Sequence, residues 1–375
     1  MNTKKLFAIA LVLMILAAAS LLTYNLFFKQ PSSGPAEETA SPGASPTGSG
    51  TAQGLLIRVI SQEKSLSPTL GADGKTVKYY SRTSANVFES AFDGSELKTI
   101  SSGVLPGLIK AVWSPDKTKV IGIFSNGTLK KYFYDHGIGK SALLDQSVGY
   151  IGWSPDSKKI VYEYFNQTTG QGNISVADPD GTNWKNIFKT RLGDMIVEWP
   201  INEKVSLRTP ASGLVQGVLY VINPDTGDFN KILNSYHGLS LKWSPKADKI
   251  LFSATNSAGK QPVLMMADEK GEQTKDLQLS GLADKCVWSK DDRTVFCAVP
   301  QQISENAVWP DDYYKGLTIV NDDFYKINLE TGEKTKIAGS QEGYGYDAQE
   351  LFLSPKEDYL FFVNRRDGLL YILKL

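Results

Sequence analysis

Short apolar runs alternate with polar stretches along most of this chain, and one pattern marks the start of each group of runs. An apolar pair leads into Trp, a Ser-Pro-Asp turn follows, and a second apolar run comes next. The pattern is clearest after Trp113, Trp153 and Trp243. Pro fixes one backbone angle of such a turn, and Asp accepts hydrogen bonds from the turn amides. The pattern therefore predicts a strand, a tight turn and a second strand at each place.

Weaker copies make this pattern a repeat. They stand at Trp199, Trp288 and Leu353, and a first copy begins at Leu66. Successive markers are 40 to 47 residues apart, except for a last interval of 65. After the first two strands, each repeat has a third β-rich run, a turn that ends in Gly and a fourth short run. Four antiparallel strands in about 40 to 47 residues are typical of one blade of a β-propeller.

The repeat resembles the WD40-like PD40 repeat of TolB-type propellers, whose mark is a Trp-Ser-Pro-Asp-Gly turn followed by an apolar strand. The resemblance covers residues 55–375. It implies an all-β fold, a seven-bladed β-propeller of four-stranded antiparallel blades, with one blade for each marker. The chain has no α/β domain before the repeats, so the resemblance does not imply a TolB role.

The two ends of the repeat region are expected to meet. The last repeat stops after its third strand, at Leu375, whereas the apolar run 55–60 precedes the first repeat and belongs to none. We expect this run to pair with the C-terminal blade, because closing the ring removes an exposed sheet edge.

The first 54 residues have a different composition. Residues 1–5 include Lys4 and Lys5, and residues 6–28 carry no charge. As a helix this run would span about 35 Å, enough to cross a hydrocarbon core of about 30 Å. We interpret it as a transmembrane anchor, with a cleaved signal peptide as the alternative. Residues 29–54 are rich in Pro, Ser, Gly and Ala and predict a disordered linker. A basic end in the cytoplasm places the propeller outside it, in the periplasm or on the cell surface.

Charge and motifs exclude several classes of function. Forty basic and forty acidic residues cancel, so no nucleic-acid partner is expected. The histidines, His136 and His237, fall in different repeats, and no nucleophile elbow or phosphate-binding loop is present. We therefore expect no metal and no cofactor, and no catalytic residue can be named.

Cys286 and Cys297 are the only cysteines. They flank the turn that follows Trp288, and counting outward from the turn places them opposite each other on neighbouring strands. Facing residues at a non-hydrogen-bonded pair have the close Cα spacing that a disulfide requires. We expect a structural disulfide, with two buried thiols as the alternative, and an extracytoplasmic location permits the oxidation.

The long last interval contains an insertion between Val299 and Ile319. Because hairpin ends alternate between the two faces of a propeller, this loop shares a face with the following link and with the loop of the last repeat. Tyr, Trp and Arg tend to dominate binding sites. The candidate contact residues are Trp309, Tyr313, Tyr314, Tyr344, Tyr346, Arg365 and Arg366. In the alternative, these aromatic side chains fold back onto the sheets and form no binding surface.

These observations favour a membrane-tethered binding or scaffold module over an enzyme. Its partner would be an envelope protein or a cell-wall glycan, since aromatic rings stack on both. The alternative is a glycan-processing hydrolase or lyase with a carboxylate site over the central channel. A glycosidase of this kind would need two carboxylates about 5 to 9.5 Å apart.

Overall fold

The computed structural model describes residues 56–101, 106–166, 168–340 and 344–375. Nearly all regular structure in these ranges is antiparallel β-sheet. The expected anchor, 6–28, and linker, 29–54, lie outside the described residues. Within the described ranges, no helix combines the length and the apolar character needed to cross a membrane.

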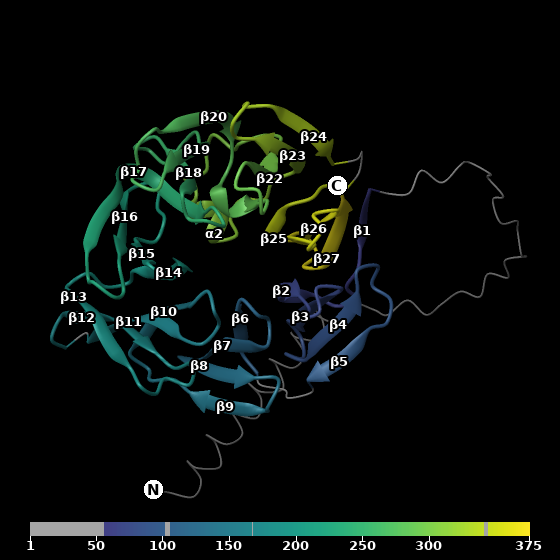
Figure 1. Cartoon of the computed structure of the whole chain (residues 1–375). Helices are drawn as coiled ribbons and strands as arrows, with labels where there is room; N and C mark the ends of the chain where they lie inside the picture. The colour runs from purple at the N-terminus through teal and green to yellow at the C-terminus, as the bar shows by residue number, and fades with distance from the viewer. Residues whose placement is uncertain (1–55, 102–105, 167, 341–343) are drawn as a thin grey trace, which may run out of the picture. The chain divides into compact units, whose positions relative to one another are not determined.

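Six sheets are arranged around a common centre, as Figure 1 shows for the part of the chain that is described. Three consecutive sheets have four strands each, in chain order. The first contains β2 (Ser65–Leu70), β3 (Thr76–Ser81), β4 (Val87–Ala91) and β5 (Lys98–Ser101). The second contains β6 (Leu108–Trp113), β7 (Lys119–Asn126), β8 (Thr128–Asp135) and β9 (Lys140–Leu143). The third contains β10 (Val148–Trp153), β11 (Ile160–Asn166), β12 (Gln171–Ala177) and β13 (Lys185–Thr190).

The fourth sheet has seven strands, because one long strand serves two groups. Its strands are β14 (Ile196–Ile201), β15 (Lys204–Arg208), β16 (Gln216–Ile222), β17 (Phe229–Trp243), β18 (Lys249–Thr255), β19 (Val263–Asp268) and β20 (Lys275–Ser280). The first part of β17 pairs with β16 and the second with β18. Near the junction at His237, Ser235 (φ 69°) and Gly238 (φ 70°) adopt left-handed backbone angles. These angles turn β17 from one four-stranded group, β14–β17, into the next, β17–β20.

Two further sheets complete the ring. One contains β21 (Cys286–Trp288), β22 (Thr294–Pro300), β23 (Asp322–Asn328) and β24 (Lys334–Ala338). The other contains β25 (Ala348–Leu353), β26 (Tyr359–Asn364), β27 (Leu370–Lys374) and, as its outermost strand, β1 (Ile57–Val59). β1 is antiparallel to β27, with Arg58 facing Ile372. The N-terminal strand of the described region therefore shares a sheet with the C-terminal strands, and its neighbour in sequence, β2, starts the adjacent sheet (Figure 1).

The recurring Trp connects neighbouring sheets. The indole Nε1 of Trp113 donates to the carbonyl oxygen of Ser67 at 2.7 Å. Trp153 donates in the same way to Val112 at 2.9 Å, and Trp288 donates to Lys242 at 3.2 Å. In each case the acceptor lies on the first strand of the preceding four-stranded group. These three tryptophans each join two consecutive units, whereas Trp199 donates to Asn202 in its own sheet.

The Ser-Pro-Asp segments form the tight turns that the pattern predicts. In the first clear copy, the hydroxyl of Ser114 and the backbone amide of Thr118 both donate to Asp116 Oδ1, at 2.5 Å and 3.0 Å. Partial burial raises the pKa of Asp116, but these hydrogen bonds outweigh it and hold this pKa at about 2. The aspartate therefore stays ionised and accepts the hydrogen bonds that stabilise the turn.

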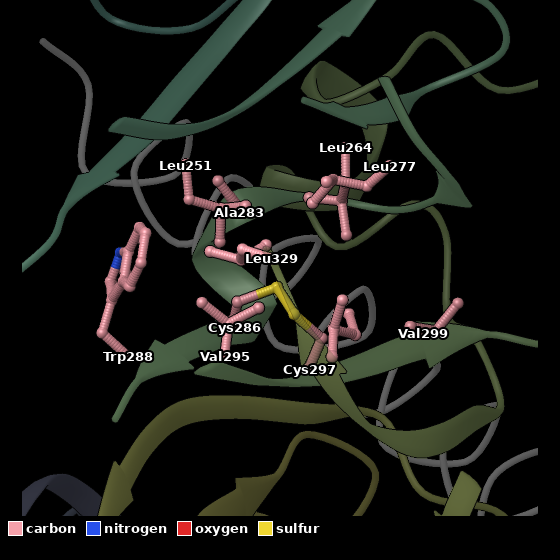
Figure 2. Packing of buried hydrophobic residues seen from close by; sticks show 11 residues of the cluster. Leu251, Leu264, Leu277, Ala283, Cys286, Trp288, Val295, Cys297, Val299 and Leu329 are labelled. Carbon is pink, nitrogen blue, oxygen red and sulfur yellow. A yellow bond between two sulfur atoms is a disulfide. The ribbon is translucent and has the colours of Figure 1, made fainter. Parts of the chain in front are cut away.

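Buried apolar clusters fill the spaces between most neighbouring four-stranded groups. The cluster shown in Figure 2 joins β18–β20 to β21–β23 and includes Trp288 and Val295. A disulfide between Cys286 and Cys297 lies inside this cluster, with the two Cα atoms 4.0 Å apart. The two cysteines face each other in the ladder between β21 and β22. The disulfide thus ties the first strand of this sheet to the second.

Candidate functional site

The long insertion, residues 301–321 between β22 and β23, is the most individual feature of the ring. It contains a short helix, α2 (Asp311–Tyr314), which lies near the middle of the ring in Figure 1. Because consecutive strands are antiparallel, the insertion shares one face with the other second-to-third-strand loops and with the links between sheets. We call this the insertion face.

The insertion reaches across the ring to the loop between β15 and β16. The Asp311 carboxylate accepts hydrogen bonds from the Ser212 hydroxyl at 2.9 Å and from the backbone amide of Gly213 at 2.7 Å. A Cβ atom on Gly213 would lie only 2.2 Å from the carbonyl oxygen of Trp309. Only glycine permits the two segments to come this close.

A second set of contacts holds the insertion to the loop between β18 and β19. The backbone amide of Trp309 donates to the carbonyl oxygen of Gly259 at 2.7 Å. The Lys260 ammonium donates to the carbonyl oxygens of Asn306 and Ala307, both at 2.9 Å. The insertion is thereby fixed to two loops that are distant in sequence.

The aromatic side chains of the insertion pack under it. Trp309 has no exposed surface and stacks on Tyr313, with the ring centroids 5.7 Å apart. Both belong to an apolar cluster with Leu282 and Val320. The core of the insertion is therefore built from its own Trp and Tyr residues.

Beneath α2 lies a buried polar network that we call the Lys285 cluster: Lys285, Tyr313, Asp322 and Asp347. Lys285 ends the 3₁₀ turn η1 (Ala283–Lys285). Its ammonium lies 2.7 Å from Asp347 Oδ1 and 2.9 Å from Asp322 Oδ2, and it donates to the hydroxyl of Tyr313 at 2.9 Å. The Tyr313 hydroxyl donates in turn to Asp347 Oδ1 at 2.8 Å. The cluster joins α2 to η1, to β23 and to the link before β25.

The Lys285 cluster holds two carboxylates against one ammonium. Burial alone lowers the pKa of Lys285, but Asp322, Tyr313 and Asp347 outweigh it and raise this pKa above its ordinary value. Burial raises the pKa of Asp322 to about 6, against the attraction of Lys285. Oδ1 of Asp322 has no hydrogen-bond partner among the described residues. Asp322 is therefore harder to ionise than an ordinary aspartate.

Two arginines from the loop between β26 and β27 close the site from the other side. The Arg365 guanidinium donates to the carbonyl oxygen of Tyr313 at 2.6 Å and lies 4.4 Å from the centre of its ring. Arg366 donates to the Val320 carbonyl at 3.0 Å and to Asn321 Oδ1 at 2.6 Å. Arg365 is half-buried, whereas Arg366 is exposed.

The seven candidate contact residues do come together, but they divide into two groups. Trp309, Tyr313 and Tyr346 are buried, with at most 8% of each side chain exposed. A partner cannot touch these side chains, so the contact role expected for them is corrected: they are core residues of the site. Tyr314 and Tyr344 are 45% and 47% exposed. With Arg366 they remain available for contact, and Arg365 mainly holds α2.

An open hollow of about 340 Å³ lies beside Arg366 on this face. It lies between the start and the end of the insertion, with Gln302 and Ser304 on one side and Thr318 and Ile319 on the other. Its lining combines amide, hydroxyl and guanidinium groups, so it suits a polar group of a partner.

Sequence reasoning missed Lys285 and Asp322. One signal was present, because each charged residue stands next to buried residues of a strand: Lys285 precedes Cys286, and Asp322 begins β23, which contains Phe324. A charged residue in such a place needs a charged partner. The partner itself could not be named, since Asp347 is 62 residues away from Lys285.

Comparisons with known proteins identify the fold. Neither a family model nor a curated protein sequence matches the chain. Among solved structures, an oligogalacturonate lyase in complex with manganese is 13% identical and has a TM-score of 0.59. The match covers 84% of this chain and 89% of that one. The β-propeller domain of the Trilobed protease from Pyrococcus furiosus is 11% identical, with a TM-score of 0.53 and coverage of 81% and 91%.

The chain is thus a β-propeller, and the propeller fold that the resemblance implies is confirmed. TolB from Acinetobacter baumannii is itself similar, at 14% identity over 74% of this chain and 63% of that one. Its TM-score is 0.45, and no argument below rests on it. At such identities the similarity concerns the fold and not the activity.

Proposed function

We propose that this protein is a seven-bladed propeller, tethered to the membrane by residues 6–28, that binds a partner in the cell envelope through its insertion face. The count of seven treats β14–β17 and β17–β20 as two blades that share one strand. The location outside the cytoplasm rests on the uncharged run 6–28 behind Lys4 and Lys5. The buried disulfide agrees with an oxidising compartment.

The distribution of exposed apolar side chains supports this proposal. Among the described residues, eight of the seventeen exposed large apolar side chains lie on the insertion face. They are Leu129, Leu192, Leu214, Val215, Tyr314, Leu317, Ile319 and Tyr344. The turns of the opposite face and the strand ends beside them carry three, Ile138, Trp184 and Phe229. Apolar side chains gathered on one face are typical of a surface that a partner covers.

The rigidity of this face is the second support. Five of the eight side chains belong to the insertion or to the loop that Asp311 binds: Leu214, Val215, Tyr314, Leu317 and Ile319. The Lys285 cluster and Arg365 fix α2 from below. A surface ordered before binding loses less conformational entropy on association.

A glycan-processing enzyme remains the alternative. The carboxylates of Asp322 and Asp347 are close together, but both are fully buried and both bind Lys285. The oligogalacturonate lyase is described in complex with manganese. In the described residues no group of three His, Cys, Asp or Glu side chains could hold a metal ion. The described side chains therefore do not provide the ligands for a manganese site. Because Asp322 and Asp347 are buried, a substrate could not reach their carboxylates.

The test is capture from a membrane and cell-wall extract by the full-length protein. A first variant carries Tyr314→Ser, Leu317→Ser and Ile319→Ser. A control variant carries Ile138→Ser and Trp184→Ser on the opposite face. We expect an envelope protein or glycan that is retained by the wild type and by the control and lost by the first variant.

Two results would reject the proposal, provided that all three proteins have the same melting temperature. Equal capture by the three would place the binding site elsewhere. Loss in the control variant alone would move the site to the opposite face. Release of unsaturated sugars from the glycan fraction would instead support the lyase.

A further inference from the structure

One boundary between neighbouring sheets, that of β2–β5 with β6–β9, lacks a buried apolar cluster in the described residues. The other pairs of adjacent four-stranded groups each share such a cluster. At this boundary the space is instead an open pocket of about 590 Å³. The pocket lies within the size range of small-molecule sites, about 300 to 1,000 Å³.

At this boundary a glycine stands where the other boundaries have a core side chain. In the first two strands of the second sheet, Trp113 faces Val120 and Ala111 faces Gly122. The equivalent position in every other second strand carries a buried side chain that packs on the preceding sheet. These residues are Tyr79, Tyr162, Leu207, Phe252, Cys297 and Phe362. Gly122 provides no side chain, and the ring of Phe124 and the side chain of Leu108 lie next to its backbone instead.

The inner half of the same boundary is firmly joined. Trp113 Nε1 donates to the Ser67 carbonyl, and the Lys78 ammonium donates to the Lys117 carbonyl, both at 2.7 Å. The ring of Tyr80 lies 5.4 Å from that of Trp113. These contacts hold the two sheets together at their inner strands. The pocket therefore lies between two sheets that are already attached to each other.

Aromatic side chains form the walls of this pocket. Tyr80 lines it from β3, Phe124 lines it from β7, and Tyr132 and Tyr134 line it from β8. Burial raises the pKa of Tyr80, with a further contribution from Tyr134 across the gap, so the hydroxyl stays protonated and can donate.

We propose that this pocket binds a flat, mainly apolar ring compound that carries an oxygen or nitrogen acceptor. The rings of Tyr80 and Tyr132 stack on its faces, and the tyrosine hydroxyls donate to the acceptor. This site is separate from the insertion face, since it lies between β3–β5 and β6–β9 on the flank of the ring.

The test uses 8-anilino-1-naphthalenesulfonate, a flat fluorescent probe, and the full-length protein. A double variant, Gly122→Phe with Phe124→Ala, reproduces the Phe252 and Ala254 pair of β18. The second change is needed because a Cβ on Gly122 would lie 2.7 Å from the ring of Phe124. Phe124→Ala alone is the control, since it enlarges the pocket. We expect saturable binding of one probe molecule to the wild type, equal or tighter binding to the control and at least about tenfold weaker binding to the double variant.

The double variant should also melt at a higher temperature than the wild type, because it completes the core. If the double variant does not fold, Ser141→Trp at the rim of the pocket replaces it, with the same expected loss of binding. Unchanged binding in the filled variant would overturn the proposal, and so would absence of saturable binding to the wild type. Either result would identify the gap as a packing defect.

Discussion

The ammonium of Lys285 lies 2.7 Å from Oδ1 of Asp347, and neither side chain has more than 1% of its surface exposed. This pair connects η1 to the link before β25, and Tyr313 binds both of its members. The insertion is therefore attached to the ring through buried charges. The insertion face depends on this attachment.

Replacing Lys285 by Met should strongly destabilise the protein. The change leaves Asp322 and Asp347 buried without a cation, and breaking a buried ion pair costs about 3 to 5 kcal/mol. Urea unfolding at neutral pH measures the loss. Lys326→Met, at an exposed position of β23, is the control and should change the free energy of unfolding by less than about 0.5 kcal/mol. A similar small effect at Lys285 would show that the cluster does not stabilise the fold.

Asp322 should make stability depend on pH. Its pKa rises from an ordinary value of 3.8 to about 6 in the folded protein, so the folded state binds the proton more tightly than the unfolded state. Its contribution is fully present below 3.8 and is lost as the pH rises through about 6. The unfolding free energy of the wild type minus that of Asp322→Asn should therefore fall as the pH rises from 3.8 to about 6.

The measurement is urea unfolding of both proteins at several pH values through this window. Asp323→Asn, at the half-buried neighbouring position, is the control for removing a carboxylate from the same strand. A wild-type-minus-variant difference for Asp322→Asn that stays constant with pH would contradict the prediction.

The disulfide should contribute a measurable part of the stability. It joins residues 11 apart, and closing a loop of this size stabilises by about 3 kcal/mol in the chain-entropy model. Cys286→Ala with Cys297→Ala should therefore unfold at a lower urea concentration than the oxidised wild type. Reduced wild type should resemble the variant. Equal midpoints for oxidised and reduced wild type would show that the bond adds no stability.

The sequence predicted those features that depend on local order. Each Trp-Ser-Pro-Asp copy specifies a strand, a turn and a strand within a few residues, and the structure has these elements after Trp113, Trp153 and Trp243. The register of Cys286 with Cys297 also follows from counting along one hairpin. Period-two strands flanking a short turn allow only a few registers.

The candidate site could be predicted only in part, because burial there depends on distant segments. Nothing near Trp309 in the sequence shows that Gly213 and Gly259 approach its backbone and enclose it. Tyr313 and Tyr314 are neighbours of the same type, yet one is 5% and the other 45% exposed. The side of α2 on which each residue falls decides this, and the direction of α2 is set by Asp311 and Arg365.

The last prediction concerns the meeting of the two ends of the ring. The side chain of Ile60, just after β1, is 5% exposed and packs against Phe361 and Val363. Its backbone amide donates to the carbonyl oxygen of Leu370 at 2.9 Å. Ile60→Ala should cost about 2 to 5 kcal/mol, as for other buried Ile residues, whereas Val59→Ala, at a position 46% exposed, should cost less than about 0.5 kcal/mol.

Deletion of residues 55–61 goes further, because it exposes the edge of β27 and removes Ile60 from its cluster. Ring closure makes the sheets unfold together, so the deletion should replace one sharp thermal transition by a broad one at lower temperature. Truncation after Gly368, which removes β27, should have the same effect. Calorimetry of the three proteins measures this, and a sharp wild-type-like transition in either shortened protein would show that closure is not needed for cooperative unfolding.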